Sequence, residues 1–177
     1  AFASSKLAAM RAFGAEVVLE ESPSGAITPE LVQRMRKRAH AFAAEAGSFY
    51  ADQFGSPHVR PGFRPMGREI AEALDGRIDL LCAGVGTGGG LMGTLDGLES
   101  AGVSPEVVAF EPAQSPFLTT GQGGPHRVEG TGVGFEPPFL DRARLKEARA
   151  VDQELADLDT PLAGAREVAF FPPMTGG

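Results

Sequence analysis

The stretch Ile78-Asp-Leu-Leu-Cys-Ala-Gly-Val85 is a short apolar run that leads directly into the glycine-rich segment Gly86-Thr-Gly-Gly-Gly90. An apolar run of this length with glycines at its end is typical of a buried β-strand. Residues 91–100 then predict a helix, and Val107-Val-Ala-Phe-Glu111 predicts a second strand. This order is a βαβ unit, so the sequence predicts an α/β fold with a parallel sheet flanked by helices.

The glycine-rich segment has the form of an anion-binding loop. A strand that passes through it into a helix leaves a row of backbone amides at the positive end of the helix dipole, where a phosphate group can bind. Glycine permits positive φ and lets a ligand approach the backbone closely, and the Thr87 hydroxyl can add a donor. The candidate phosphate-binding residues are therefore Gly86, Thr87, Gly88, Gly89 and Gly90.

Other glycine motifs match this segment less well. No Gly-Lys-Ser/Thr follows the glycines, so the segment is not a Walker phosphate loop. The spacing of Gly88, Gly90 and Gly93 does match the dinucleotide-binding pattern G-x-G-x-x-G. Glu111 then stands about 20 residues on, where that fold places an acidic residue. Two alternatives remain open. One is a dinucleotide-binding oxidoreductase, and the other is a βα turn whose glycines allow close packing and bind no ligand.

The composition limits the possible partners. The chain has 177 residues, of which 42% are hydrophobic, which is enough for one domain with a sizeable core. Its 16 basic and 23 acidic residues give a net charge of -7, which argues against nucleic acid and anionic membranes as partners. No apolar run approaches the roughly 20 residues that cross a bilayer, and no signal peptide is recognisable. We expect a cytoplasmic protein whose single cysteine, Cys82, is a buried strand residue.

Capping residues and periodicity predict the remaining elements. Residues 3–13 read as the end of a helix, and because the chain opens there without methionine, we expect that a preceding segment is missing. Thr28 before Pro29 predicts the start of a helix that runs towards Gly47. We further expect strands at 16–20 and 48–51, irregular structure at 55–66, a helix at 67–74, a glycine-rich run at 121–134 and a charged helix at 140–150.

Six segments in the same order resemble one enzyme family. They are Met10-Arg-Ala-Phe-Gly-Ala-Glu-Val-Val-Leu19, Asp52-Gln-Phe54, Gly67-Arg-Glu-Ile70, Val85-Gly-Thr-Gly-Gly-Gly-Leu-Met-Gly93, Val108-Ala-Phe-Glu-Pro112 with Ser115-Pro116, and His126-Arg-Val-Glu-Gly-Thr-Gly-Val-Gly-Phe135. Over about residues 4–147 the chain resembles the fold-type-II pyridoxal-phosphate (PLP) enzymes, specifically cysteine synthase and cystathionine beta-synthase. The resemblance implies pyridoxal 5'-phosphate as cofactor, a small-molecule amino acid as substrate and a homodimer for the intact family member.

The resemblance also implies roles for particular residues. Residues 86–90 would hold the cofactor phosphate, although the family usually ends this loop in threonine where this chain has Gly90. Gln53 would hold the substrate carboxylate, and Gly130 and Gly132 would line the cofactor face near the ring. By this comparison residues 1–50 are the remainder of a small domain and the return to a large one, 51–150 are the large PLP-binding domain and 151–177 are an appended tail.

The chain departs from the family at the catalytic lysine. The family holds PLP as a Schiff base on a lysine in a Ser-x-Lys-Asp-Arg-like segment, followed by a Thr-Ser-Gly-Asn loop, and neither is present in this sequence. The lysines of the chain are Lys6, Lys37 and Lys146, each expected to be a surface charge. We therefore assign no catalytic residue and expect little or no turnover, although the parent function would be β-replacement on an O-activated serine to form cysteine.

The tail resembles a different kind of protein. Val151-Asp-Gln-Glu154, Leu158-Asp-Thr-Pro-Leu162 and Glu167-Val-Ala-Phe-Phe-Pro-Pro-Met-Thr-Gly-Gly177 resemble the last third of a ubiquitin-like sulfur carrier. In such carriers a terminal diglycine, here Gly176 and Gly177, is adenylated and converted to a thiocarboxylate. The resemblance implies a sulfur carrier or its activating enzyme as partner, and a sulfur-carrier or interaction protein as the alternative function. Alternatively, this diglycine has no function and is a frayed end or a cloning scar.

Overall fold

The computed structural model describes residues 4–22, 28–126, 128 and 130–151. The chain forms two compact units, Ala1–Tyr50 and Ala51–Gly177. The tail that resembles a sulfur carrier, with Gly176 and Gly177, lies outside the described residues.

In its described part, the first unit contains two helices, α1 (Ser4–Ala12) and α2 (Pro29–Ala43). The Thr28 hydroxyl caps α2 by accepting a hydrogen bond of 3.2 Å from the amide of Leu31, as the Thr-Pro pair predicts. The strand expected at 16–20 does not form, since the described part of this unit contains helices but no strand. This segment instead contacts α2, where Arg38 pairs with the Glu20 carboxylate at 2.8 Å. The strand expected at 48–51 is likewise not a strand.

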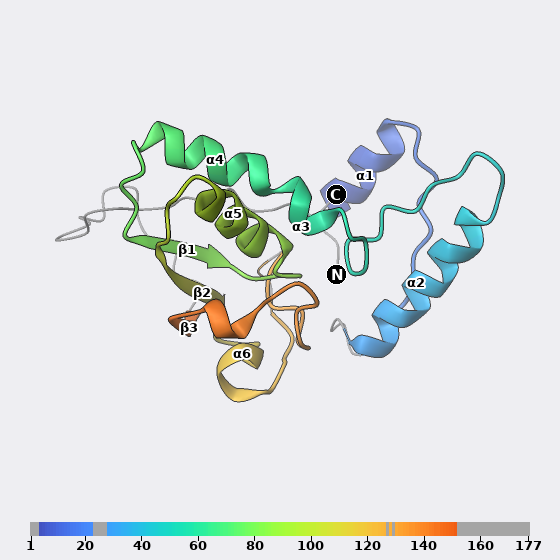
Figure 1. Ribbon diagram of the computed structural model, residues 1–177. Helices are drawn as coiled ribbons and strands as arrows, with labels where there is room; N and C mark the ends of the chain where they lie inside the picture. The colour runs from blue at the N-terminus through green and yellow to red at the C-terminus, as the bar shows by residue number, and fades with distance from the viewer. Residues whose placement is uncertain (1–3, 23–27, 127, 129, 152–177) are drawn as a thin grey trace. The chain divides into compact units, whose positions relative to one another are not determined.

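The second unit is built on a three-stranded sheet (Figure 1). Its strands are β1 (Leu80–Gly84), β2 (Glu106–Pro112) and β3 (Glu147–Val151), in the order β1-β2-β3 and all parallel. Helix α5 (Gly89–Ser100) connects β1 to β2. The predicted βαβ unit and the predicted α/β class with a parallel sheet are therefore confirmed.

Residues 59–62 and 64–66 are helical, which differs from the irregular structure that the prolines predicted, whereas the helix predicted at 67–74 is confirmed over residues 67–73. Helix α3 (Val59–Gly62) contains Pro61, and helix α4 (Arg64–Ala73) has Pro65 as its second residue. A proline in the first turn of a helix removes an amide that has no intrahelical acceptor, so it costs no hydrogen bond. Prolines at these positions begin helices rather than break them.

The core lies between the sheet and helices α4 and α5, which Figure 1 shows on the same side of the strands. Helix α5 is apolar on most of its surface, as expected for a crossover helix that packs on a sheet and under another helix. Its buried side chains meet those of the strands and of Ala71 in one cluster. These buried residues are Ala71, Leu81, Ala83, Val85, Leu91, Met92, Leu95, Leu98, Val103, Val107 and Ala109.

Glycines bring α4 and α5 into direct backbone contact. A β-carbon at Gly67 of α4 would lie 2.0 Å from the Thr94 carbonyl oxygen, and one at Gly97 of α5 would lie 2.2 Å from the Arg64 carbonyl oxygen. Distances below 3.0 Å essentially do not occur for real side chains, so the two helices can approach this closely only through glycine. Gly93 has the same role against α3, where the Arg60 carbonyl oxygen would lie 2.2 Å from a β-carbon.

The prediction of a charged helix at 140–150 is wrong. Asp141 caps a short 3-10 helix, η1 (Arg142–Arg144), by accepting a hydrogen bond of 3.1 Å from the amide of Ala143. The chain then enters β3, which begins beside β2 where the amide of Lys146 donates to the carbonyl of Val107 at 2.8 Å. Pairing with β2 satisfies the backbone of this segment, and this tertiary interaction outweighs the helix propensity of its alanines and charged residues. Helix α6 (Phe117–Thr120) follows β2.

Candidate functional site

The glycine loop, residues 86–90, begins just beyond the carboxyl end of β1 and passes into the first turn of α5. Gly88 is the N-cap of this helix and has φ of +84°, in the left-handed region that favours glycine. None of the five amides from Gly86 to Gly90 donates a hydrogen bond to another described residue. The loop thus offers a row of free donors at the positive end of a 12-residue helix, which suits a phosphate group.

Three segments of chain wall this loop, and each contacts a different glycine. A β-carbon at Gly86 would lie 2.3 Å from the carbonyl oxygen of Gly130, one at Gly88 would lie 2.7 Å from the amide nitrogen of Leu140, and one at Gly89 would lie 2.4 Å from a methyl group of Val59. The Phe139 amide also donates a hydrogen bond of 3.0 Å to the Thr87 carbonyl. Close packing therefore requires these three glycines, in addition to any contact with a ligand.

Gly132 is held on both sides of its peptide unit. Its amide donates to the Val85 carbonyl at 2.8 Å, directly before the glycine loop. Its carbonyl accepts hydrogen bonds from Ser115 Oγ at 3.3 Å and from His126 Nε2 at 2.8 Å. Because His126 Nδ1 accepts from the amide of Val128, the Nε2 atom carries the proton in the neutral ring. The bond to Val85, together with the close approach of Gly86 to the Gly130 carbonyl oxygen, places Gly130 and Gly132 next to the glycine loop.

Gln53 lies in the turn after Asp52 and is exposed. The turn is closed by the Asp52 carboxylate, which accepts a hydrogen bond of 3.1 Å from the amide of Phe54. The Phe54 ring lies 6.1 Å from the ring of Phe135, so this turn neighbours the end of the 130–135 segment. The structure therefore brings the turn that carries Gln53 close to the segment of Gly130 and Gly132.

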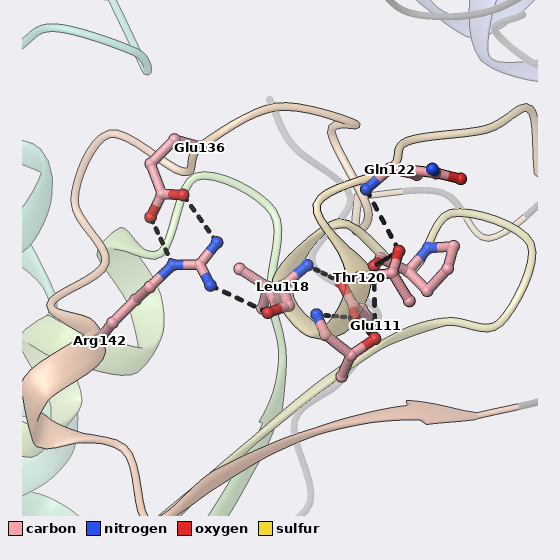
Figure 2. A network of polar contacts seen from close by, with 8 residues as sticks. Glu111, Leu118, Thr120, Gln122, Glu136 and Arg142 are labelled. Atoms are coloured by element: carbon pink, nitrogen blue, oxygen red, sulfur yellow. Dashed lines mark hydrogen bonds and ion pairs between the residues drawn. The ribbon is translucent and has the colours of Figure 1, made fainter.

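Glu111, at the carboxyl end of β2, has a structural role (Figure 2). Only 3% of its surface is exposed, and its carboxylate accepts hydrogen bonds from the amides of Leu118 and Thr119 at 2.6 and 2.9 Å and from the Thr119 hydroxyl at 2.8 Å. A carboxylate bound in this way caps α6 and is not available to a ribose. Together with the packing role of Gly93, this geometry disfavours the dinucleotide-binding alternative.

Arg142 holds the same short helix from its other side, as Figure 2 shows. Its guanidinium binds both carboxylate oxygens of Glu136, at 2.8 and 2.7 Å, and donates to the Leu118 carbonyl at 2.9 Å. It also lies 5.9 Å from the centre of the Phe117 ring. A small hollow between α6 and residues 132–135 is lined by Phe117 and Leu118 and also by Val85, which directly precedes the glycine loop.

Asp96 binds two arginines from segments far apart in the sequence. On α5, its carboxylate accepts two hydrogen bonds of 2.7 Å from Arg60 of α3 and one of 2.8 Å from Arg144 of η1. Arg64 lies 3.8 Å away, and Arg144 also pairs with Glu99 at 2.8 Å. The two hydrogen bonds from Arg60, and then the one from Arg144, lower the pKa of Asp96 to about 2 against the opposing effect of burial. Sequence reasoning missed this cluster.

The lysine of the second unit and the cysteine do not contribute a nucleophile to the glycine loop. Lys146 pairs with Glu106, which begins β2 and so lies at the opposite end of the sheet from the loop. Lys37 is exposed on α2. Cys82 lies in β1, as predicted, but is half-buried rather than buried. Within the described ranges there is no group of three or more possible metal ligands, and no helix is long and apolar enough to cross a bilayer.

Comparison with known proteins identifies the fold. The family model described as pyridoxal-phosphate dependent enzyme matches residues 2–169. The chain belongs to this family. The match runs past residue 147, which is about where the resemblance seen in the sequence ends. The family relationship and pyridoxal phosphate as the cofactor of the family are therefore confirmed.

Individual members of the family are similar over most of the chain. A cysteine synthase of Staphylococcus aureus is 38% identical over 138 residues, which are 75% of this chain and 41% of the relative. The crystal structure of a cysteine synthase from Entamoeba histolytica has a TM-score of 0.70 and 29% identity, and covers 84% of this chain and 43% of that one. An O-acetylserine dependent cystathionine beta-synthase from Helicobacter pylori has a TM-score of 0.71 and 26% identity, and covers 84% and 47%. The chain thus spans less than half the length of these relatives.

Proposed function

We propose that the glycine loop binds the phosphate group of pyridoxal 5'-phosphate. The observation that carries this proposal is the row of amides from Gly86 to Gly90, none of which has a partner among the described residues, at the start of α5. A phosphate dianion there would accept several of these amides and would interact favourably with the helix dipole. The Thr87 hydroxyl is a further donor on the same loop. Gly90 supplies an amide but no hydroxyl.

The function that these features support best is that of a cysteine synthase, which forms cysteine from an O-activated serine and a sulfide donor. Bound pyridoxal phosphate supplies an electron sink that acidifies the α-proton of an amino-acid substrate. The residues of this chain would bind and orient the reactants. Residues 86–90 would fix the phosphate, Gly130 and Gly132 would leave space beside the ring, and Gln53 would hold the substrate carboxylate.

In this proposal residues 51–150 are most of the large PLP-binding domain, and residues 1–50 are the remainder of a small domain with its return to the large one. The homodimer and the cytoplasmic location expected from the sequence belong to the same proposal. The isolated chain is expected to turn over little or nothing. Lys146 supports this expectation because its ammonium group is paired with Glu106, at the other end of β2 from the glycine loop.

Binding of PLP by the purified chain tests the proposed site. Pyridoxal lacks the phosphate group, so the proposal predicts that it binds far more weakly than PLP and that orthophosphate competes with PLP. Absorbance before and after borohydride, followed by intact mass, shows whether a lysine becomes modified. A specific adduct on one lysine would contradict the expected inactivity, and equal affinity for PLP and pyridoxal would contradict the phosphate site.

We keep the sulfur carrier as the alternative function because segments within residues 151–177 resemble the last third of a ubiquitin-like sulfur carrier, with Gly176 and Gly177 as the diglycine. In that case the working group would be the carboxylate of Gly177. Incubation with a sulfur-carrier activating enzyme, ATP and sulfide would then replace one oxygen of this carboxylate by sulfur, a mass gain of about 16 that intact mass spectrometry detects. An unchanged mass would exclude this alternative for the pairing tested.

A further inference from the structure

The carboxylate of Asp96 connects the two segments that pack against Gly88 and Gly89. On one side, Arg60 neighbours Val59, whose methyl group would lie 2.4 Å from a β-carbon at Gly89. On the other side, Arg144 ends η1, which follows Leu140 in the chain. The amide nitrogen of Leu140 would lie 2.7 Å from a β-carbon at Gly88. Both arginines hydrogen-bond to Asp96, so one carboxylate ties together both walls.

The geometry of these bonds is that of a specific anchor rather than a loose surface pair. Arg60 binds the two oxygens of Asp96 through Nε and one terminal nitrogen, both at 2.7 Å, which fixes the guanidinium plane. The Asp96 side chain is 12% exposed and that of Arg144 is 20% exposed, so water screens this pair less than an ordinary surface ion pair. Arg64 also lies 3.8 Å from the carboxylate, and Arg144 also pairs with Glu99 at 2.8 Å.

Backbone contacts of the two walls connect this restraint to the glycine loop. Helix α3 lies directly against α5, because a β-carbon at Gly93 would lie 2.2 Å from the carbonyl oxygen of Arg60. Near the second wall, the amide of Phe139 donates to the carbonyl of Thr87 at 3.0 Å. If either wall moves away, the loop loses a packing partner on that side and its free amides lose their fixed direction.

We propose that Asp96 is a positioning residue for the glycine loop, and that it acts by holding Arg60 and Arg144 and thereby the two segments that wall the loop. This inference rests on the proposed phosphate site for its consequence in ligand binding. The restraint of the glycine loop itself can be measured without any ligand.

The variant Asp96→Asn keeps the shape of the side chain and removes its charge, and Glu106→Gln is its matched control. Glu106 pairs with Lys146 in the same unit but at the end of β2 that lies away from the loop. Hydrogen exchange of the full chain reports the restraint through the amide of Phe139, which binds the loop, relative to the amide of Val85, which donates to Phe110 at 2.9 Å within the sheet. PLP and orthophosphate are the binding probes, used where each variant is fully folded.

We expect Asp96→Asn to speed exchange at Phe139 relative to Val85 and to weaken PLP binding by roughly tenfold, as the loss of charge-assisted hydrogen bonds predicts. Glu106→Gln should change neither quantity. Because Arg60 acts through Asp96, the two substitutions should not be additive. Arg60→Gln should weaken PLP binding less when it is made in the Asp96→Asn variant than when it is made in the unaltered chain. Unchanged exchange at Phe139, or equal acceleration at Phe139 and Val85, would overturn the inference.

The two proposals fail in different ways. If the unaltered chain binds neither PLP nor orthophosphate, the proposed phosphate site is wrong, and the exchange result alone decides whether Asp96 restrains the loop. If the unaltered chain binds PLP and Asp96→Asn binds it equally well, the phosphate site stands and Asp96 is not a positioning residue.

Discussion

The amide of Gly132 donates a hydrogen bond of 2.8 Å to the carbonyl of Val85, the last residue before the glycine loop. The two residues are far apart in the sequence, and this bond joins the glycine-rich run after α6 to the carboxyl end of β1. Beside it, the Gly130 carbonyl oxygen would lie only 2.3 Å from a β-carbon at Gly86. The proposed phosphate loop and the proposed cofactor face are therefore a single packed unit, which makes its glycines sensitive to substitution.

Gly86→Ala should destabilise the chain by about 1–3 kcal/mol, because the new methyl group would meet the Gly130 backbone and the two segments would have to separate. Urea unfolding followed by circular dichroism measures this change. Gly62→Ala is the matched control, since a β-carbon at Gly62 has open space around it and should change stability by less than about 1 kcal/mol. Equal effects of the two substitutions would contradict the close approach of Gly86 and Gly130.

Glu111→Gln should also lower stability, by about 1–3 kcal/mol, because the new amide group cannot accept all the hydrogen bonds that Leu118 and Thr119 donate to the buried carboxylate. The thermal unfolding midpoint measures the loss. The comparison is Glu136→Gln, whose side chain is 55% exposed and whose pair with Arg142 should contribute about 0–1 kcal/mol. If Glu136→Gln is the more damaging change, the cap on α6 is not the important contact.

Asp96 should make the stability of the chain depend on acid. Its pKa of about 2 in the folded chain lies below the value of about 3.9 for an unfolded aspartate. Its ion pairs therefore contribute fully above about pH 4, and this contribution is lost as the pH falls towards 2. Allowing for the partial exposure of the arginines, we expect Asp96→Asn to cost about 1–2 kcal/mol at pH 7.

Urea unfolding of the unaltered chain and of Asp96→Asn at pH 7, 4 and 2 measures this dependence. The difference between the two should be constant from pH 7 to about 4 and should shrink at pH 2. A difference that stays the same at pH 2 would mean that the charge of Asp96 does not stabilise the fold.

Thr28→Ala should destabilise α2 by about 1 kcal/mol, because the amide of Leu31 would lose its acceptor at the start of the helix. Thr28→Ser keeps the hydroxyl and should retain most of the stability. Helix content measured by circular dichroism during thermal unfolding compares the two. Loss of stability in the serine variant as large as in the alanine variant would show that the hydroxyl cap is not responsible.

The sequence predicts the centre of the second unit because the signals there are local. The apolar run at β1, the glycines that follow it and the apolar helix α5 each carry their own pattern, and a crossover through a helix then places β2 parallel to β1. The hydroxyl of Thr28 likewise predicts the start of α2 from neighbouring residues alone.

The errors arise where distant partners decide the structure. Residues 147–151 have the composition of a helix but pair with β2, whose Val108 lies opposite Glu147. The contacts of Asp96 were also missed, since Arg60 lies 36 residues before it and Arg144 lies 48 residues after it. In the sequence, Asp96 is one of two charged residues on a mostly apolar helix, and no local pattern pairs it with these arginines.

The most direct test of the account is the amide NMR spectrum of the 15N-labelled chain during titration with PLP and, separately, with orthophosphate. The phosphate site predicts that the amide signals of residues 86–90 shift with both ligands, and that those of Gly130 and Gly132 shift with PLP but less with orthophosphate. Shifts confined to other parts of the chain, or no shifts in the glycine loop at ligand concentrations where binding occurs, would contradict the proposed site.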